Sequence, residues 1–187
     1  MPNHITNILT IYGTDEQVDK VLEFIKNDEL GVGTIDFNKI TPMPPWVFQG
    51  NLGMEEEEKY GKENCWYDWS IKNWGTKWNA YDQPSDRNTK NKIHFETAWS
   101  NVLELIRKLS WVFPDVEFLY QWADEDDIGA NVGSSKIKDG KLYNTLIPPS
   151  YSIAAYKMAF EITGQKPEDY GMRFGDEKME YVSIDEK

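Results

Sequence analysis

Residues 66–78 constrain the fold of this chain more than any other stretch, because they hold four of its eight tryptophans. That much aromatic surface must either be buried in a core or face a partner, since large rings gain from leaving water. Trp66, Trp69 and Asn73 lie at positions i, i+3 and i+7, which predicts a helix with one shared face. Gly75 is placed to end that helix.

The segments before this stretch alternate between strand and helix patterns. Residues 4–12 predict a strand with apolar side chains on one face. A helix follows over residues 14–25, and it begins with a capping box formed by Thr14 and Gln17. A second strand is predicted at residues 34–40, where apolar positions again alternate.

The same order of strand, helix and strand returns after a long connection. Residues 93–97 and 116–122 predict strands, and an amphipathic helix that ends at Pro114 lies between them. Two such units predict an α+β fold of the ferredoxin-like, split β-α-β type, in which an antiparallel sheet carries two helices on one face. The connection, residues 41–92, becomes a long tryptophan-rich insert between the second and third strands.

The C-terminal part is predicted to extend the same sheet. Residues 130–147 can form a hairpin around Asp139 and Gly140, a pair that favours a tight turn. A third helix is expected at about residues 150–163, and a short strand near residues 179–184.

These elements predict one domain with a C-terminal addition that packs on it. Residues 1–147 form the ferredoxin-like domain, which includes the insert at 41–92 and the hairpin at 130–147. Residues 148–187 add a helix and a polar tail that pack on that domain. A chain of 187 residues is long enough to build one core of this kind.

Charge and cysteine content restrict the classes of function. The chain has 20 basic and 32 acidic residues and a net charge of −12, which repels phosphate backbones and argues against general nucleic-acid binding. Cys65 is the single cysteine, so the chain forms no intramolecular disulfide and no cysteine-based zinc site. The sequence shows no signal-peptide pattern and no membrane-spanning run, so we expect a cytoplasmic protein without membrane association.

The leading candidate site is the end of the tryptophan-rich stretch, where aromatic, amide, hydroxyl and amine side chains follow one another. Its residues are Asn73, Trp74, Gly75, Thr76, Lys77 and Trp78. The two tryptophans can form a platform for a ring or a partner's side chain, and Lys77 can add a charge or a cation–π contact. In the alternative interpretation, the tryptophans are core side chains that attach the insert to the sheet. Trp99, at the end of the predicted third strand, is also a candidate binding residue. Packing against Trp74 or Trp78 of the returning insert is the alternative, and the sequence favours it over ligand contact.

Acidic and histidine residues offer weaker candidates. An acidic set made of Asp115, Glu117 and residues 124–127 could bind a hard metal ion. The run at 124–127 lacks the spacing of a calcium-binding loop, and the set fits a solvated face better. His94 and Glu96 share one strand face and could form an acid–base pair, although a packed or solvent-facing histidine fits better. Motifs for phosphate loops, dinucleotide binding and hydrolysis are missing. We therefore predict no catalytic residues, no bound metal and no cofactor.

Several short strings of the sequence coincide with the pattern of a known family. They are Met-Pro-Asn-His from residue 1, Ile-Thr-Pro-Met-Pro from residue 40, Asn-Trp-Gly-Thr-Lys-Trp-Asn-Ala from residue 73, Phe-Glu-Thr-Ala-Trp-Ser from residue 95 and Phe-Pro from residue 113. Over about residues 1–135 the chain resembles the YubB-like family, whose members carry a ferredoxin-like domain and occur on plasmids, phages and other mobile elements. The resemblance implies that fold and a bacterial or phage cytoplasmic setting, and no catalytic role can be carried over from it.

Three functions are compatible with these observations, and we rank them in this order. The first is a non-enzymatic accessory protein of a mobile element that binds a protein or small ligand through the tryptophan-rich insert. The second is an acidic protein that imitates nucleic acid and thereby blocks a host defence protein. The third is a metal-dependent hydrolase or nuclease that uses Asp and Glu. A homodimer formed through sheet edges or faces is compatible with the fold.

Overall fold

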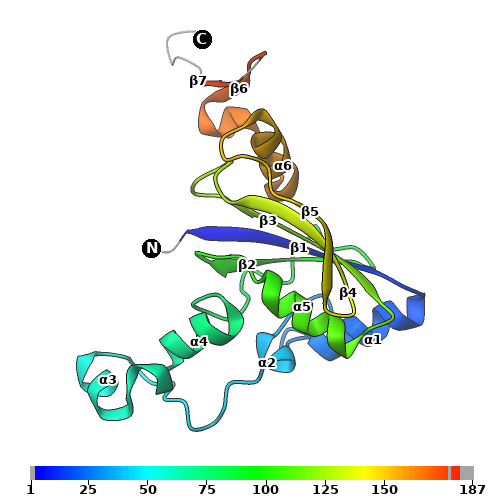
Figure 1. Cartoon of the computed structure of the whole chain (residues 1–187). Coiled ribbons are helices and arrows are strands. Elements are labelled where there is room, and N and C mark those ends of the chain that lie inside the picture. Colours follow the sequence, from blue (N-terminus) through cyan, green and yellow to red (C-terminus); the bar gives the residue numbers. More distant parts are fainter. Residues whose placement is uncertain (1–2, 177, 182–187) are drawn as a thin grey trace.

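A five-stranded antiparallel sheet forms the centre of the protein in a computed structural model that describes residues 3–176 and 178–181 (Figure 1). The strands follow the order β2-β1-β3-β4-β5 across the sheet. Their bounds are β1 (His4–Tyr12), β2 (Lys92–Ala98), β3 (Glu117–Asp124), β4 (Val132–Lys138) and β5 (Lys141–Leu146). Strand β1 pairs along most of its length with both β2 and β3, so it lies inside the sheet.

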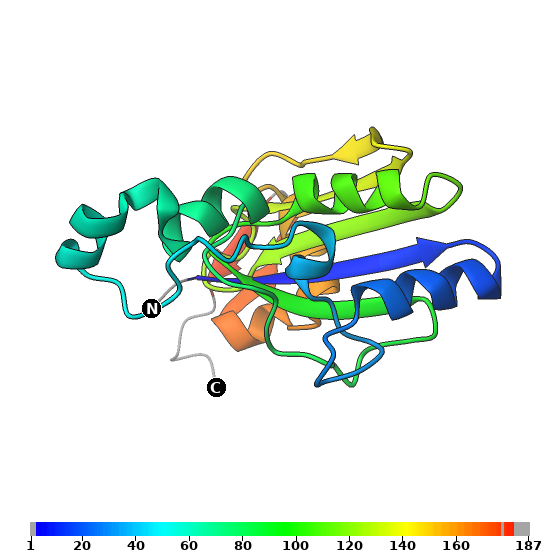
Figure 2. The ribbon, with the colours of Figure 1, turned by 90° about the horizontal axis from the view of Figure 1, so that it is seen from below.

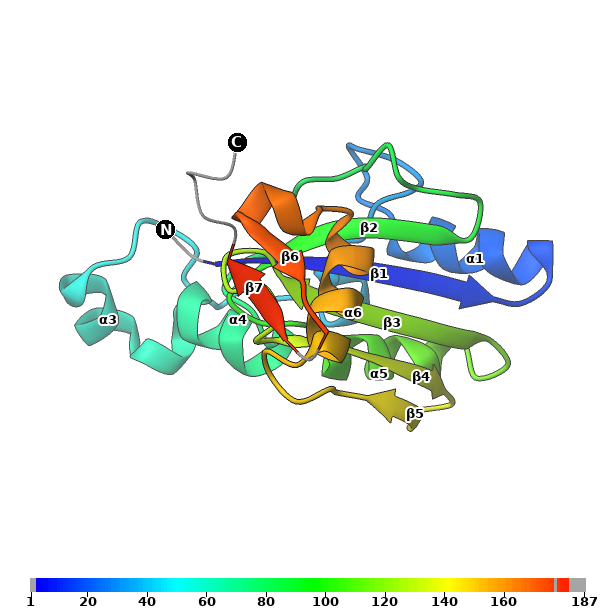
Figure 3. The same ribbon diagram turned by 90° about the horizontal axis from the view of Figure 1, so that it is seen from above.

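Helices cover both faces of this sheet. On one face lie α1 (Asp15–Ile25), α2 (Phe37–Ile40) and α5 (Leu103–Val112), as Figure 2 shows from below. Helix α6 (Ile153–Thr163) crosses the opposite face (Figure 3). Helices α3 (Met54–Tyr60) and α4 (Trp66–Trp74) extend beyond one end of the sheet (Figure 2). Within the described residues, no helix combines the length and the apolar character that crossing a membrane requires.

The remaining short elements lie in the insert and near the C-terminus. A 3-10 helix spans Lys62–Asn64, and a second spans Pro167–Tyr170. Strands β6 (Met172–Phe174) and β7 (Met179–Tyr181) pair with each other in a separate small sheet. The strand predicted near residues 179–184 is therefore present at its start, and its last residues lie outside the described part of the chain.

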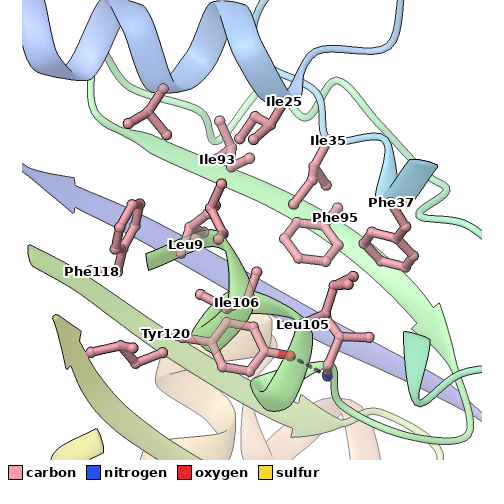
Figure 4. Packing of buried hydrophobic residues seen from close by; sticks show 14 of the residues in the cluster. Leu9, Ile25, Ile35, Phe37, Ile93, Phe95, Leu105, Ile106, Phe118 and Tyr120 are labelled. Carbon is pink, nitrogen blue, oxygen red and sulfur yellow. Dashed lines mark hydrogen bonds between the residues drawn. The ribbon is translucent and has the colours of Figure 1, made fainter. Parts of the chain in front are cut away.

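The main core lies between the sheet and the first group of helices. Apolar side chains from alternate positions of β1, β2 and β3 meet the buried stripes of α1 and α5 (Figure 4). Helix α1 begins as predicted, because the Thr14 side chain accepts a hydrogen bond from the Gln17 amide and the Gln17 side chain accepts one from the Thr14 amide. A second core lies on the other face, where Ala155, Ala159 and Phe160 of α6 pack with Ile8.

A buried polar network links three strands of the main core to α5. The fully buried Asn7 donates from Nδ2 to the Ile5 carbonyl at 2.7 Å and to Thr97 Oγ1 at 2.9 Å. Its Oδ1 accepts a hydrogen bond from the Tyr120 hydroxyl, which in turn accepts one from the Val102 amide at 2.8 Å. Burial raises the pKa of Tyr120, so the hydroxyl remains protonated and able to donate.

The prediction of a second strand at residues 34–40 is wrong. The apolar positions Ile35 and Phe37 are buried as their alternation suggests, but Phe37 begins the short helix α2. Side chains from the insert form hydrogen bonds with the backbone N–H and C=O groups of this segment, as a neighbouring strand would in a sheet. Gln83 accepts from the Ile35 amide and donates to the Ile35 carbonyl, both at 2.9 Å, while Asn79 Oδ1 accepts from the Phe37 amide at 2.9 Å. The backbone groups of this segment are therefore paired without a sheet.

The sheet consequently contains one split β-α-β unit instead of two. Strands β2 and β3 are both antiparallel to β1, so they run parallel to each other on its two sides, with α5 as their connection. The α+β class and the antiparallel sheet are confirmed. The predicted unit of β1, α1 and a strand at 34–40 does not form, because the chain leaves α1 for α2 and the long insert.

Strands β4 and β5 complete the far edge of the sheet. They are antiparallel and turn through Asp139 and Gly140, which both have positive φ, at 47° and 68°. An Asp-Gly pair suits this turn because glycine, and to a lesser degree aspartate, tolerates the left-handed region. The turn lies beside the C-terminal end of α5, at the end of the sheet away from α4 (Figure 2).

Candidate functional site

Helix α4 and its C-terminal turn position the tryptophan motif. Gly75 follows the helix with φ of 85°, and its amide donates to the Ile71 carbonyl at 3.1 Å and to the Ser70 carbonyl at 3.2 Å. Glycine is suited to this position because a side chain at such a φ would be strained. The turn redirects the chain so that residues 76–78 run past the end of β2.

Trp74 belongs to the core. Its side chain is 5% exposed, and its ring meets those of Phe37 and Trp69 edge to face, with centroid distances of 5.9 Å and 5.4 Å. The indole Nε1 donates to the Thr41 carbonyl at 2.8 Å. Trp74 therefore attaches the insert to the main core, as the structural interpretation of the motif predicts.

Asn73 and Thr76 also bond within the chain. The buried Thr76 hydroxyl donates to the Ala98 carbonyl at 2.8 Å and accepts from the Ala98 amide at 3.1 Å, so it takes the place of a neighbouring strand at the end of β2. The Asn73 side chain donates to the Trp69 carbonyl at 2.8 Å within α4. The structure thus places Asn73, Trp74, Gly75 and Thr76 in contacts that build the fold.

The second half of the motif lies at the surface. Trp78 and Trp99 are 38% and 40% exposed, and the Lys77 ammonium lies between them. The Nζ atom of Lys77 is 4.6 Å from the centroid of the Trp78 ring, 4.9 Å from that of Trp99 and 5.7 Å from that of Tyr67. Tyr81 extends the group, with its ring 6.1 Å from Trp78. We call Tyr67, Lys77, Trp78, Tyr81 and Trp99 the aromatic ridge.

The backbone at Trp99 is strained. Its φ of 69° lies in the left-handed region, which a bulky side chain adopts at a free-energy cost of order 1–3 kcal/mol. The Trp99 amide donates to the Asn3 carbonyl at 2.9 Å, which helps to hold this conformation. Complete burial of the ring does not offset the free-energy cost of this backbone conformation, because the ring is partly exposed. Backbone strain of this kind is typical of functional positions.

A polar cluster lies at the Tyr81 end of the ridge. The Tyr81 hydroxyl and Glu96 Oε2 each lie 3.0 Å from His4 Nδ1, and the Tyr81 backbone pairs with that of Glu96 at 2.9 Å and 3.1 Å. Burial, followed by the nearby Glu125 carboxylate, raises the pKa of Glu96. Burial also raises the pKa of Tyr81. The sequence did not connect His4 with Tyr81, since strand pairing brings them together across 77 positions of the chain.

Behind this cluster lies a pocket of about 210 Å³. Four of its lining residues are acidic: Asp82, Asp86, Glu96 and Glu125. Arg87 also lines it, but its guanidinium donates to the last carbonyls of α6, those of Ile162 and Thr163, at 2.7 Å each. The Glu125 carboxylate accepts a hydrogen bond from the Thr6 hydroxyl. The pocket therefore presents negative charge, with its arginine already bonded to main-chain carbonyls.

The predicted His94–Glu96 pair shares this pocket, but each residue has another partner. The amide of His94 donates to Asn88 Oδ1 at 2.8 Å, and its ring Nδ1 lies 3.3 Å from the same atom, whereas Glu96 bonds with His4. Burial, together with Arg87 and Lys92, lowers the pKa of His94 to about 4. The imidazole is therefore neutral at pH 7.

We predict that this histidine makes the fold acid-sensitive. Unfolded His94 has a pKa near 6.5, so as the pH falls toward 4 the unfolded chain binds a proton that the folded chain does not. The free energy of unfolding should fall by about 1–2 kcal/mol from this group between pH 6.5 and 4.5. Urea unfolding of the wild type and His94→Gln at both pH values measures the difference. Equal pH dependence in the two proteins would contradict the assignment.

The acids at residues 124–127 form a local turn. Asp124 Oδ1 accepts hydrogen bonds from the amides of Asp126 and Asp127, both at 3.0 Å. Asp126 Oδ2 accepts from the His4 amide at 2.7 Å. Among the residues that the structure describes, no group of three or more His, Cys, Asp or Glu side chains is arranged to hold a metal ion.

Comparison with known proteins identifies a domain type. Residues 77–164 match the family model described as a ferredoxin-like domain in Api92-like protein. The match begins within the aromatic ridge, at Lys77, and continues through β2, α5, β3, β4, β5 and α6. No curated protein and no solved structure matches the chain. The chain therefore contains a region similar to this ferredoxin-like domain, and Lys77, Trp78, Tyr81 and Trp99 lie inside that region.

Proposed function

We propose that the protein is a non-enzymatic binding protein that engages a protein or small ligand through the aromatic ridge. One observation carries this proposal: Trp69 and Trp74 are buried in the core, while Trp78 and Trp99 remain about 40% exposed on either side of Lys77. Neither exposed ring belongs to the two buried cores, so core packing does not account for two large side chains at these places.

The ridge has the properties of a binding hot spot. Tryptophan and tyrosine contribute large contact areas with little loss of side-chain freedom, and they dominate the energetics of many interfaces. Contacts with Lys77 keep the rings of Tyr67, Trp78 and Trp99 close to one another before a partner arrives. The strained backbone of Trp99 adds to this pre-organisation, which lowers the entropy lost on binding.

We further propose that this binding protein acts in the cytoplasm as an accessory protein of a mobile element, as in the YubB-like family. Two observations support the setting. The string from Asn73 to Ala80 resembles that family's motif, and residues 77–164 are similar to a ferredoxin-like domain. The buried residues of the string attach the insert, and the exposed ones provide the proposed contact surface.

Selection from a random dodecapeptide display library tests the proposal. We expect the immobilised wild-type protein to enrich peptides that the double variant Trp78→Ala/Trp99→Asn no longer retains, with binding at least tenfold weaker because both platform rings are lost. Asparagine is chosen at position 99 because it tolerates a positive φ, so the variant should keep its fold. Circular dichroism and urea unfolding verify that it does.

Trp111→Ala is the matched control. Trp111 is 53% exposed, lies on α5 and packs beside Gly140 at the opposite end of the sheet. The control should retain the enriched peptides within about twofold of the wild type, as expected for a residue outside the interface. Equal loss in both variants, or a library that yields no peptide dependent on the ridge, would overturn the proposed binding function.

A further inference from the structure

We propose that the partner binds as a basic protein segment, with an aromatic or apolar side chain on the ridge and a lysine or arginine side chain in the adjoining acidic pocket. This inference rests on the proposed binding function and specifies the partner of the same site. It follows from the continuity of the two surfaces and from their charge.

The ridge and the pocket adjoin each other where Tyr81 pairs with Glu96. Tyr81 belongs to the ridge through its contact with Trp78, and its backbone bonds on both sides to Glu96, which lines the pocket. A segment that crosses Trp78 and Tyr81 therefore passes beside Glu96 and Asp82, which both line the pocket. The pocket volume of about 210 Å³ is sufficient for the end of one long cationic side chain.

Charge selects the kind of side chain that enters. Four carboxylates line the pocket, and Arg87, which lies with them, is bonded to the carbonyl end of α6. Burial and Glu125 disfavour the ionised form of Glu96, and an incoming cation would relieve that unfavourable environment. An anionic side chain would instead approach several carboxylates, and it would also be repelled by the net charge of −12.

The ridge receives the aromatic or apolar side chain of the segment. The ammonium of Lys77 already lies beside the rings of Tyr67, Trp78 and Trp99, and it would repel a second cation placed there. The basic side chain of the partner is therefore directed to the acidic pocket. Complementary charge would also speed its association, and this effect should weaken as salt is added.

The peptides enriched by the wild-type protein provide the test. We expect them to carry net positive charge, and one of them, labelled with fluorescein, is titrated by fluorescence anisotropy. The double variant Glu96→Gln/Glu125→Gln should weaken its binding by tenfold or more, since two carboxylates that face the cation are neutralised. The control Glu55→Gln/Glu58→Gln changes the net charge equally on the exposed helix α3 and should change affinity by less than twofold.

The outcomes separate this inference from the proposed function. Enriched peptides that depend on Trp78 and Trp99 but are neutral or acidic would overturn the basic partner and leave the binding function intact. Equal weakening in the two glutamate variants would also overturn it, because the attraction would then come from net charge alone. Failure to enrich any peptide dependent on the ridge would overturn both.

Discussion

Replacing Trp74 with alanine is expected to lower the free energy of unfolding by about 3–5 kcal/mol, the range for large-to-small changes of buried aromatic residues. The substitution removes the edge-to-face contacts with Phe37 and Trp69 and opens a cavity where the insert meets the core. It also leaves the Thr41 carbonyl without the indole donor that now lies 2.8 Å away. Urea unfolding followed by far-ultraviolet circular dichroism measures the change.

Trp78→Ala provides the comparison, because the two tryptophans lie four positions apart in the same motif. Trp78 is 38% exposed and its ring contacts are at the surface, so its loss should lower stability by about 1 kcal/mol or less. Similar losses in both variants would mean that the whole motif belongs to the core. That result would contradict the proposal that the ridge is a binding surface.

This division explains why the motif combines its particular residue types. Trp74 and Thr76 point inward and bond to Thr41 and Ala98, which fixes the path of the chain on both sides of Gly75. That fixed path determines where Lys77 and the exposed rings lie. The structural and the proposed binding roles therefore belong to adjacent residues, and the first makes the second possible.

Local sequence patterns were sufficient to predict most of the sheet. Strand alternation located β1, β2 and β3 within two residues at each end, and the capping box located the start of α1. The segment at 34–40 could not be assigned in this way. Its alternating apolar residues are buried, but Asn79 and Gln83, more than 40 positions away, supply its hydrogen bonds. Periodicity reports which side chains are buried and does not reveal the source of the backbone partners.

The residue types of the insert were sufficient to locate the candidate site, but they predicted only partly which of its side chains are exposed. The tryptophan density identified the insert as the place to look, but four of the seven predicted binding residues bond within the fold. Which rings are exposed depends on how α4 packs against α2 and α5, and this packing is tertiary. His4 and Tyr81 carry no sequence signal that connects them with Trp78, because β-sheet pairing alone brings them close.

The network around Asn7 should be the most sensitive polar feature of the core. Asn7→Ala removes the partner of the Tyr120 hydroxyl, of Thr97 Oγ1 and of the Ile5 carbonyl, all in a fully buried place. Each unsatisfied buried group costs about 1–3 kcal/mol, although the Tyr120 hydroxyl keeps its bond with the Val102 amide. We expect a loss of about 3–4 kcal/mol in the free energy of unfolding.

A double-mutant cycle distinguishes a network from a simple loss of packing. Tyr120→Phe should cost about 1–3 kcal/mol alone, and less in the Asn7→Ala background, where the hydroxyl has already lost one of its partners. Additive effects, within about 0.5 kcal/mol, would contradict the coupling.

Thr10→Val on the same strand is the control. The Thr10 hydroxyl is buried without a hydrogen-bond partner in the described structure, so its removal should be neutral or stabilising. If Thr10→Val and Asn7→Ala lower the free energy of unfolding equally, strand β1 is sensitive to any substitution. If only Asn7→Ala lowers it, the stability comes from the Asn7 hydrogen bonds.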